Sequence, residues 1–471
     1  MKLSSSVHFV GISGIGMSAL ARILLQRGYR VSGSSDRATA LTERLSAEGA
    51  RVCIGHASEN LDGAATVVVS SAISEDNREL AAARERGLSI LHRGALLATL
   101  MAERRGIAIA GTHGKTTMTA MIAAVLEAGG LDPTVAVGGE RGDTKSNARD
   151  GAGAWFVAEA DESDLSFLDL HPEIAVVANI ENDHVDSDAD IARLVAAFER
   201  FVCGVPSNGL LLLGADDRRA AALARAGVAT RTRTFGFGAD ADIRARDVVY
   251  AGFGSQFTVT VDGDTIGAIS LRVPGAINIV DALPALAVGR ELGVPFATIG
   301  EALARFAGVR RRFDIRARSS RLTVVDDYAH HPTAIAATIE AARAAFDGPL
   351  VAVFQPHRYT RTSYLGGAFA RALQGADHVV LTDIYAASEP PLPGVDATTI
   401  GAPLAALGTE VAYVRAVADV PAYVLAHAPR GALVLMLGAG SISDAAAVLA
   451  EAVLAEAGAA AGRADAGRAP R

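Results

Sequence analysis

The chain has 471 residues, half of them hydrophobic and 20% charged, with a formal net charge of −8. The length is about three times that of a typical domain, so we expect two or three cores, and the negative charge argues against nucleic-acid binding. No apolar run approaches the roughly 18 residues of a membrane span and the N-terminus does not resemble a signal peptide, which predicts a cytoplasmic protein without membrane contact.

Residues 7–24, VHFVGISGIGMSALARIL, begin as an apolar strand, pass through a glycine cluster and continue as a helical pattern. Gly14, Gly16 and Ala19 fit the G-x-G-x-x-A turn of dinucleotide-binding folds. Asp36 follows Gly16 by 20 residues, at the end of the expected second strand. These features leave a nicotinamide-dependent oxidoreductase open as one hypothesis.

Short strands alternate with helices over the rest of this region, which predicts a doubly wound α/β sheet up to about residue 105. The expected strands are 50–55, 65–72 and 88–92, and the expected helices include 15–27 and 78–87.

A second strand, loop and helix begin at residue 106 with GIAIAGTHGKTT. Backbone N–H groups at such a helix start can hold phosphates, Lys115 supplies a positive charge for them, and the Thr116 hydroxyl can bind Mg²⁺. Ile109 stands where the standard P-loop has its first glycine, so this is a variant loop, which we expect to be exposed. The residues predicted to hold the phosphates are Gly111, Thr112, His113, Gly114, Lys115, Thr116 and Thr117.

Polar groups follow the next two apolar strands, AWFVAEA and AVVANI. The first strand leads into Glu159, Asp161, Glu162 and Asp164, and the second into Asn179, Asp183, His184 and Asp186. A solvated acidic turn and a structural histidine are the alternatives. Because three successive strand ends meet at one edge of a parallel sheet, the combination favours a site for ATP and Mg²⁺.

A third α/β block contains the strands RLTVVDDYAHHP, PLVAVFQPHRY, HVVLTDIY and ALVLMLGAGS. We therefore predict three α/β domains at 1–105, 106–313 and 314–455, the second with a β-rich insertion at 240–273. Residues 456–471 are rich in Ala, Gly and Arg, and we expect a frayed or disordered tail. The basic run VRRRF at 309–313, taken by itself, is equally consistent with a solvated helix end and with a functional segment.

The segments GTHGKTT, EADESDLSFL, NIENDHVD, GVRRRF, VVDDYAHHPT, FQPHRYTRT and LTDIYAASEPPLPGV occur in this order and resemble the Mur ligase family over roughly residues 7–450. GISGIGMSAL and SSAISEDN point to the branch that joins L-alanine to UDP-N-acetylmuramate. The resemblance implies an α/β fold with a Rossmann-like N-terminal domain that holds UDP-sugar and no nicotinamide. It also implies a central P-loop-type ATPase domain with a mixed sheet and a Rossmann-like C-terminal domain.

The activity implied by the resemblance is ATP-dependent amide formation through an acyl phosphate, in the synthesis of peptidoglycan precursors. The substrates would be ATP, UDP-N-acetylmuramate and L-alanine, the cofactor Mg²⁺, and the protein a monomer or homodimer. Catalytic roles are implied for Lys115, Glu159, His184 and Arg312. Mg²⁺ would be held by Thr116, Glu159 and His184. Further ATP contacts are implied for Asn278, Asp281, Arg312 and Asp326.

Two other groups of site residues follow from the same resemblance. The UDP-sugar residues would be Gly14, Ile15, Gly16, Met17, Ser18 and Ser71. The amino-acid residues would be Tyr328, His330, Arg358 and Arg361, since paired arginines suit a carboxylate. A surface turn is the alternative for QPHRYTR.

The chain departs from the family pattern at several positions. Ile277 and Asp281 replace His and Asn in VPGAINIVDAL, Ser35 replaces Asp, Ala334 replaces Glu, and GAGSI replaces GAGDI. Asp281 leaves the detail of adenine recognition open, because an ionised carboxylate only accepts hydrogen bonds. The alternatives that remain are a ligase with another amino-acid or peptide acceptor, a binding-only homologue, and the oxidoreductase.

Overall fold

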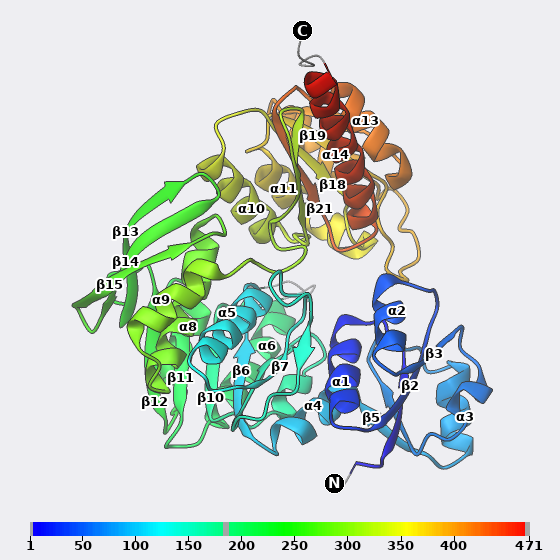
Figure 1. The fold of residues 1–471 in the computed structure, drawn as a ribbon, viewed down its shortest axis with the longest axis vertical. Helices are drawn as coiled ribbons and strands as arrows, with labels where there is room; N and C mark the ends of the chain where they lie inside the picture. The colour runs from blue at the N-terminus through cyan, green and yellow to red at the C-terminus, as the bar shows by residue number, and fades with distance from the viewer. Residues whose placement is uncertain (1–2, 182–187, 467–471) are drawn as a thin grey trace. The chain divides into compact units, whose positions relative to one another are not determined.

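The computed structural model describes residues 3–181 and 188–466. The chain divides into two compact units. The first contains Met1–Asp247, Thr258–Ile269 and Val280–Phe306, and the second contains Val248–Phe257, Ser270–Ile279 and Ala307–Arg471. The described residues form three sheets (Figure 1), which confirms the predicted α/β class. The limits predicted for three domains stay predictions.

The first sheet has five parallel strands in the order β3-β2-β1-β4-β5. The strands are β1 Ser6–Val10, β2 Arg30–Ser35, β3 Arg51–Ile54, β4 Thr66–Val69 and β5 Ser89–His92. The helices between them are α1 Ile15–Gln26, α2 Ala40–Ala47, α3 Arg78–Glu85 and α4 Arg93–Met101. The chain runs from β1 through β2 to β3 at one edge of the sheet, and then crosses back to β4 on the other side of β1. The loops after these two strands therefore lie at the switch point where open α/β sheets bind ligands.

The second sheet has ten strands in the order β15-β14-β13-β12-β11-β10-β6-β9-β7-β8. Its parallel centre consists of β6 Arg105–Ala110, β9 Trp155–Glu159, β10 Ile174–Val177, β11 Leu210–Gly214 and β12 Arg231–Gly236. The strands toward its two edges are β7 Thr134–Ala136, β8 Ala148–Arg149, β13 Ile243–Ala251, β14 Gly254–Val261 and β15 Asp264–Leu271. The β7 and β8 pair is antiparallel, so the sheet is mixed as predicted. The expected β-rich insertion forms β13, β14 and β15, whose residues the two units share.

Helices α5 Lys115–Ala128, α6 Asp188–Cys203, α7 Arg218–Ala222, α8 Ala276–Glu291 and α9 Phe296–Arg305 accompany this sheet. The central strands β6, β9, β10 and β11 are almost wholly buried. Continuous apolar runs of this kind are typical of strands in a parallel sheet that is covered on both faces.

The third sheet lies in the second unit, with the order β16-β17-β21-β18-β19-β20. Its strands are β16 Asp314–Arg318, β17 Leu322–Asp327, β18 Leu350–Phe354, β19 His378–Leu381, β20 Glu410–Tyr413 and β21 Ala432–Leu437. Its helices are α10 Pro332–Ala345, α11 Tyr359–Leu373, α12 Thr398–Ala406, α13 Val420–His427 and α14 Ile442–Ala466. All the strand pairs are parallel except β16 with β17.

Alternation along β21 explains how this sheet is covered. Leu433 and Leu435 pack into one core with α10, α11 and α12, whereas Val434 and Met436 pack into another with α13 and α14. Figure 1 shows α10 and α11 on one side of the sheet and α13 and α14 on the other. Helix α14 continues to Ala466, into the segment from residue 456 that was expected to be a tail, and the frayed or disordered state of that segment stays a prediction. Alanine has the highest helix propensity, which explains the continuation.

A buried glutamate organises the first sheet. Glu79, in the first turn of α3, is fully buried, and its carboxylate accepts hydrogen bonds from Ser34 Oγ at 2.5 Å and Asn60 Nδ2 at 2.6 Å. His56 Nδ1 lies 2.9 Å away and His8 Nε2 lies 3.7 Å away. Burial by itself would raise the pKa of Glu79, but these four partners outweigh it and lower the pKa from 4.5 to about 2. The carboxylate is therefore ionised, and it ties α3 to the end of β2.

Glu79→Gln should destabilise the protein at neutral pH, by roughly 3 kcal/mol for a pKa shift of this size. Because the folded-state pKa is lowered, the stabilisation is fully present above pH 4.5 and is lost as the pH falls through about 2. The difference in unfolding free energy between parent and variant should therefore shrink from pH 6 toward pH 3. Urea unfolding of both proteins across this range measures it. A difference that stays constant with pH would show that the Glu79 charge is not what stabilises this region.

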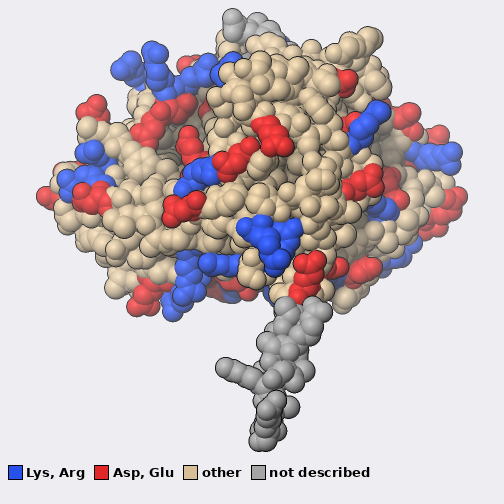
Figure 2. All heavy atoms as spheres, turned by 90° about the horizontal axis from the view of Figure 1, so that it is seen from above, with Lys and Arg blue, Asp and Glu red and all other residues tan. Residues whose placement is uncertain are grey.

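On the face that Figure 2 shows, basic and acidic side chains alternate over the coloured residues, and neither forms an extended field there. Among the helices of the described residues, none combines the length and the apolar character that crossing a bilayer requires.

Candidate functional site

The loop between β6 and α5, predicted to hold phosphates, contains two glycines with positive φ angles. Gly111 and Gly114 have φ angles of +128° and +84°, which a residue with a Cβ adopts only with strain. The backbone N–H of Thr112 donates to Asn179 O at 3.1 Å, and that of His113 donates to the Asn179 side chain at 2.8 Å. Asn179, just after β10, thus holds the loop in place. This contact agrees with the prediction that these strand ends lie close together at one edge of the sheet. Thr116 and Thr117 are buried in the first turn of α5.

Lys115 is paired with Glu162. Its ammonium lies 2.8 Å and 2.9 Å from the two carboxylate oxygens and donates to the carbonyl of Gly111 at 2.5 Å. Burial by itself would lower the pKa of Lys115, but the charge and hydrogen bonds of Glu162, with the charges of Asp161 and Glu159, raise it. The expectation of an exposed loop is wrong for this side chain, which is only 16% exposed, because the acidic strand end of β9 folds over it.

The three acids that follow β9 have different partners. Glu162 faces Lys115, whereas Asp161 and Asp164 lie 2.9 Å and 3.4 Å from Arg93 Nη2. Burial would raise the pKa of Asp161, but the Arg93 charge and hydrogen bonds from Ser163 lower it. A solvated acidic turn is therefore excluded as a description of this segment, since its carboxylates are engaged with specific cations.

Of the residues predicted to hold a metal, Glu159 and Thr116 lie within the described part of the chain. Glu159 ends β9, is partly buried and accepts a hydrogen bond from the Gly138 N–H at 2.5 Å. Thr116 follows Lys115 at the start of α5, on the neighbouring strand-to-helix unit. The third predicted ligand, His184, lies outside the described residues, as do Asp183 and Asp186.

The glycine loop after β1 starts α1 at Gly14, which caps the helix. Ile15 is 40% exposed, whereas Met17 and Ser18 are buried, and the Ser18 N–H donates to Gly14 O at 2.8 Å within the helix. A Cβ on Gly16 would lie 3.2 Å from the Arg93 guanidinium. On the neighbouring β4 loop, Ser71 Oγ donates to Asp164 at 3.1 Å.

Arg93 therefore connects two predicted sites within the first unit. Its guanidinium, 16% exposed, lies over Gly16 of the first glycine loop and pairs with the acidic segment beside Lys115. The α4 start approaches that segment closely: a Cβ on Gly94 would lie 2.3 Å from Ser166 Cβ. Sequence inspection gave no signal for Arg93, because its role depends on a contact with residues about seventy positions later.

In the second unit, the four predicted amino-acid residues follow the ends of β17 and β18. Tyr328 and His330 follow β17, and their rings are 5.0 Å apart. Arg358 stands immediately before α11 with a strained φ of +70°, and Arg361 is buried in the first turn of that helix. A simple surface turn does not describe QPHRYTR, because strained backbone and a buried arginine both require defined surroundings.

The predicted ATP residues of this unit are also located. Arg312 lies over the Tyr328 ring, with its guanidinium carbon 5.0 Å from the centroid. Asp326 is fully buried, accepts a hydrogen bond from Ser443 Oγ at 2.6 Å and lies 3.8 Å from Arg311. Burial raises the pKa of Asp326, against the opposing effects of Ser443 and the nearby arginines. The ATP contact that the resemblance implies for Asp326 would require this side chain to become exposed.

Asn278 and Asp281 also have defined surroundings. They belong to VPGAINIVDAL, the segment that departs from the family pattern. Asn278 donates from its amide to the Pro274 carbonyl at 2.6 Å. Asp281 is buried in the first unit, and a Cβ placed on Gly114 would come within 2.6 Å of its Oδ1. The carboxylate that replaces the usual amide therefore lies against the phosphate-loop glycine.

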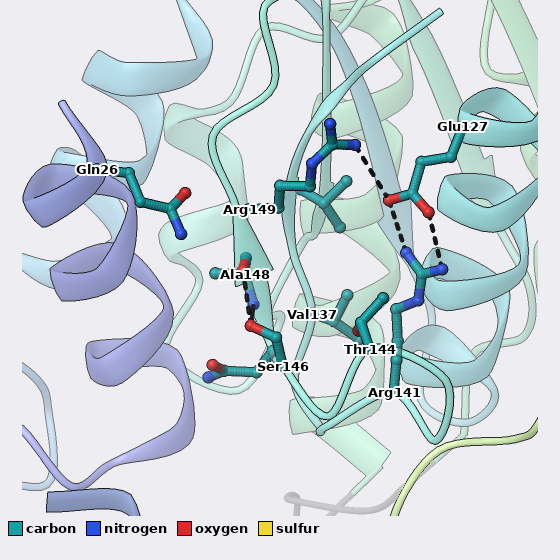
Figure 3. A pocket seen from close by; sticks show the side chains of 10 residues that line it. Gln26, Glu127, Val137, Arg141, Thr144, Ser146, Ala148 and Arg149 are labelled. Atoms are coloured by element: carbon teal, nitrogen blue, oxygen red, sulfur yellow. Dashed lines mark hydrogen bonds and ion pairs between the residues drawn. The ribbon is translucent and has the colours of Figure 1, made fainter. Parts of the chain in front are cut away.

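A cavity of about 330 Å³ in the first unit contains none of the predicted site residues. Figure 3 shows that Arg141 and Arg149 both point toward Glu127 at the end of α5, and Arg141 binds it through two hydrogen bonds of 2.8 Å. Arg141 also pairs with Asp143 at 2.7 Å. These groups neutralise one another, so the cavity offers no ligand a clear charge partner.

Comparison with known proteins agrees with this arrangement. Three family models match in succession: the Mur ligase family catalytic domain at residues 6–105, the Mur ligase middle domain at 109–289, and the Mur ligase glutamate ligase domain at 311–440.

Curated proteins and solved structures resemble nearly the whole chain. The UDP-N-acetylmuramate–L-alanine ligase of Geotalea uraniireducens is 45% identical and aligns over 94% of this chain and 97% of its own. The protein of the same name from Acidothermus cellulolyticus is 47% identical over 92% of this chain and 91% of its own.

The crystal structure of the UDP-N-acetylmuramate-alanine ligase of Thermotoga maritima has a TM-score of 0.83 and 30% identity, covering 96% of this chain and 99% of that one. The murein peptide ligase of Psychrobacter arcticus, with a TM-score of 0.72 and 24% identity over 95% and 98% of the two chains, shares the fold. With family matches to all three sheet regions and relatives of this identity over most of its length, the chain belongs to the Mur ligase family.

Proposed function

We propose that this protein is an ATP-dependent ligase that joins L-alanine to the carboxylate of UDP-N-acetylmuramate, in the synthesis of peptidoglycan precursors. The observation that carries the proposal is that three strand ends meet around Lys115. Glu162 holds the lysine, and Asn179 holds the loop. The names of the relatives at about 45% identity support the choice of substrates. We expect the enzyme to act in the cytoplasm, as a monomer or homodimer.

The reaction overcomes the poor reactivity of a carboxylate. A muramoyl carboxylate oxygen attacks the γ-phosphorus of ATP, and ADP leaves. The free amine of L-alanine then attacks the acyl carbon of the resulting acyl phosphate, and the carbon–oxygen bond breaks to release inorganic phosphate. Neither step needs a covalent enzyme intermediate, so catalysis depends on positioning and on stabilising negative charge.

The residues of the first unit suit the first step. Lys115 would exchange its contact with Glu162 for the β and γ phosphates, and the N–H groups at the start of α5 would bind phosphate oxygens. Arg93, between the first glycine loop and the acidic segment, would limit repulsion as the anionic sugar nucleotide approaches. Tyr328, His330, Arg358 and Arg361 would receive the amino acid on the second unit.

Mg²⁺ fits the donor set at the phosphate loop. Glu159 and the Thr116 hydroxyl supply the hard oxygen ligands that this ion prefers, and Glu159 is held by the Gly138 N–H. His184 is the further ligand that the family resemblance implies. Bound there, the ion would neutralise phosphate charge and so let two anions approach each other.

Phosphate release by the purified protein tests the function. It should require ATP, UDP-N-acetylmuramate and L-alanine together, and the product should be the UDP-N-acetylmuramoyl amide. Glycine, L-serine and a tripeptide in place of L-alanine measure acceptor preference. Faster turnover with the tripeptide would favour a murein-peptide ligase, and no turnover with any acceptor would favour a binding-only homologue.

ATP with Mg²⁺ should raise the melting temperature, whereas NAD⁺ should not, because only a ligand that binds the native state stabilises it. At a hundredfold excess over Kd, the stabilisation would be about 2.7 kcal/mol, a shift of several degrees. Thermal scans with each ligand, and with EDTA added to ATP, measure the effect. A comparable shift with NAD⁺ would revive the oxidoreductase hypothesis, for which the first glycine loop and Asp36 are the only support.

A further inference from the structure

Four aromatic rings form a continuous row at the strand ends of the third sheet. Tyr328 and His330 follow β17, His357 follows β18, and Tyr385 follows β19. Successive ring centroids are 5.0, 5.5 and 5.5 Å apart. The first two rings belong to the predicted amino-acid residues, so the row continues that group to His357 and Tyr385, which sequence inspection did not single out.

The Tyr385 ring is fixed in position although it is 41% exposed. It stacks on the His357 ring with an angle of 15° between the planes. It also lies directly over Gly440, where an added Cβ would come within 2.6 Å of Tyr385 Cγ. The ring therefore occupies space that any side chain at residue 440 would take, and it presents the rest of its surface to solvent.

The same segment holds the backbone of Arg358. The Arg358 N–H donates to the Tyr385 carbonyl at 2.9 Å, and His357 and Tyr385 form a parallel bridge. Arg358 has a φ of +70°, a conformation that persists in non-glycine residues only when the surroundings impose it. The residue predicted to bind the carboxylate and the Tyr385 ring thus belong to one rigid frame.

We propose that the Tyr385 ring, supported by His357, is the wall that limits the size of the acceptor side chain. The inference rests on the proposed function. An amino acid whose carboxylate is held by Arg358 and Arg361 has a fixed α-carbon, so its side chain extends over a defined path. A rigid aromatic surface beside that path accommodates a methyl group and excludes longer or branched chains, since a fixed ring cannot yield without losing its stacking on His357.

The test compares kcat/KM for L-alanine, L-2-aminobutyrate and L-valine in the parent enzyme and in Tyr385→Ala. The ratio of kcat/KM for L-2-aminobutyrate to that for L-alanine should rise by about tenfold or more, the discrimination that one methylene carries in an apolar pocket. Tyr385→Phe retains the ring and should retain the parent ratio. Tyr385→Leu shortens the wall and should raise the ratio by less than Tyr385→Ala.

Tyr364→Ala is the matched control, because Tyr364 is a tyrosine of the same unit that is 59% exposed on α11. This variant should leave the kcat/KM ratios of L-2-aminobutyrate and of L-valine to L-alanine unchanged. The KM for ATP and the melting temperature report whether each variant is folded. Equal loss of activity with all three acceptors in Tyr385→Ala would overturn the inference, as would a changed ratio in Tyr385→Phe. Absence of ligation in the parent enzyme would instead refute the proposed function.

Discussion

Lys115→Ala is expected to lower kcat for ligation by at least about a thousandfold, the range seen when a cation that stabilises transferring phosphate is removed. The reason is electrostatic, because Lys115 places an ammonium at the start of α5, next to the loop after β6, and Glu162 already orients it. Phosphate release at saturating substrates measures the loss. Retained turnover within about tenfold of the parent, a barrier change of only about 1.4 kcal/mol, would contradict the assigned role.

The structure adds a control to this experiment. Removing Lys115 leaves Glu162, only 4% exposed, without its cation, and this could cost up to roughly 3 kcal/mol of stability. The double variant Lys115→Ala/Glu162→Gln removes both charges and should recover the melting temperature without recovering activity. Lys145→Ala, at an exposed loop lysine of the same unit, should leave both properties near the parent values. Recovery of activity in the double variant would mean that Lys115 acts only by neutralising Glu162.

Arg358→Lys and Arg361→Lys are each expected to raise the KM for L-alanine by roughly ten- to a hundredfold, while the KM for ATP stays nearly constant. Lysine keeps the positive charge but lacks the planar fork that binds a carboxylate through two hydrogen bonds. A charged hydrogen bond contributes roughly 1.5–3 kcal/mol, which corresponds to this range. Steady-state kinetics with L-alanine and ATP varied separately distinguishes acceptor binding from phosphate binding.

Arg371→Lys is the matched control for both variants, because Arg371 is exposed on the same helix, α11, and should keep both constants. An unchanged KM for L-alanine in Arg358→Lys and Arg361→Lys would overturn the assignment of acceptor binding to this loop. A selective rise in the KM for ATP would place these arginines on the phosphates instead.

The sequence alone was sufficient to predict the main features of the fold, including the strand, glycine loop and helix around Lys115. Buried parallel strands are continuous apolar runs, and the glycines and Lys115 of GTHGKTT follow such a run directly, so local pattern identifies both. The same logic predicted that the ends of β6, β9 and β10 share an edge, and Asn179 indeed binds the backbone of the loop. The sequence was not sufficient to predict the length of α14. An alanine-rich segment without apolar periodicity resembles a tail, although its helix propensity is high.

Only the tertiary structure decided which partner each charged or aromatic side chain has. Glu159, Asp161, Glu162 and Asp164 are equivalent acids in the sequence, but folding places Glu162 on Lys115 and two of the others on Arg93. Tyr385 likewise reaches His357 only because β18 and β19 are adjacent in the sheet. Such pairings depend on contacts between residues far apart in the chain, and their energies depend on burial, which neither residue type nor spacing specifies.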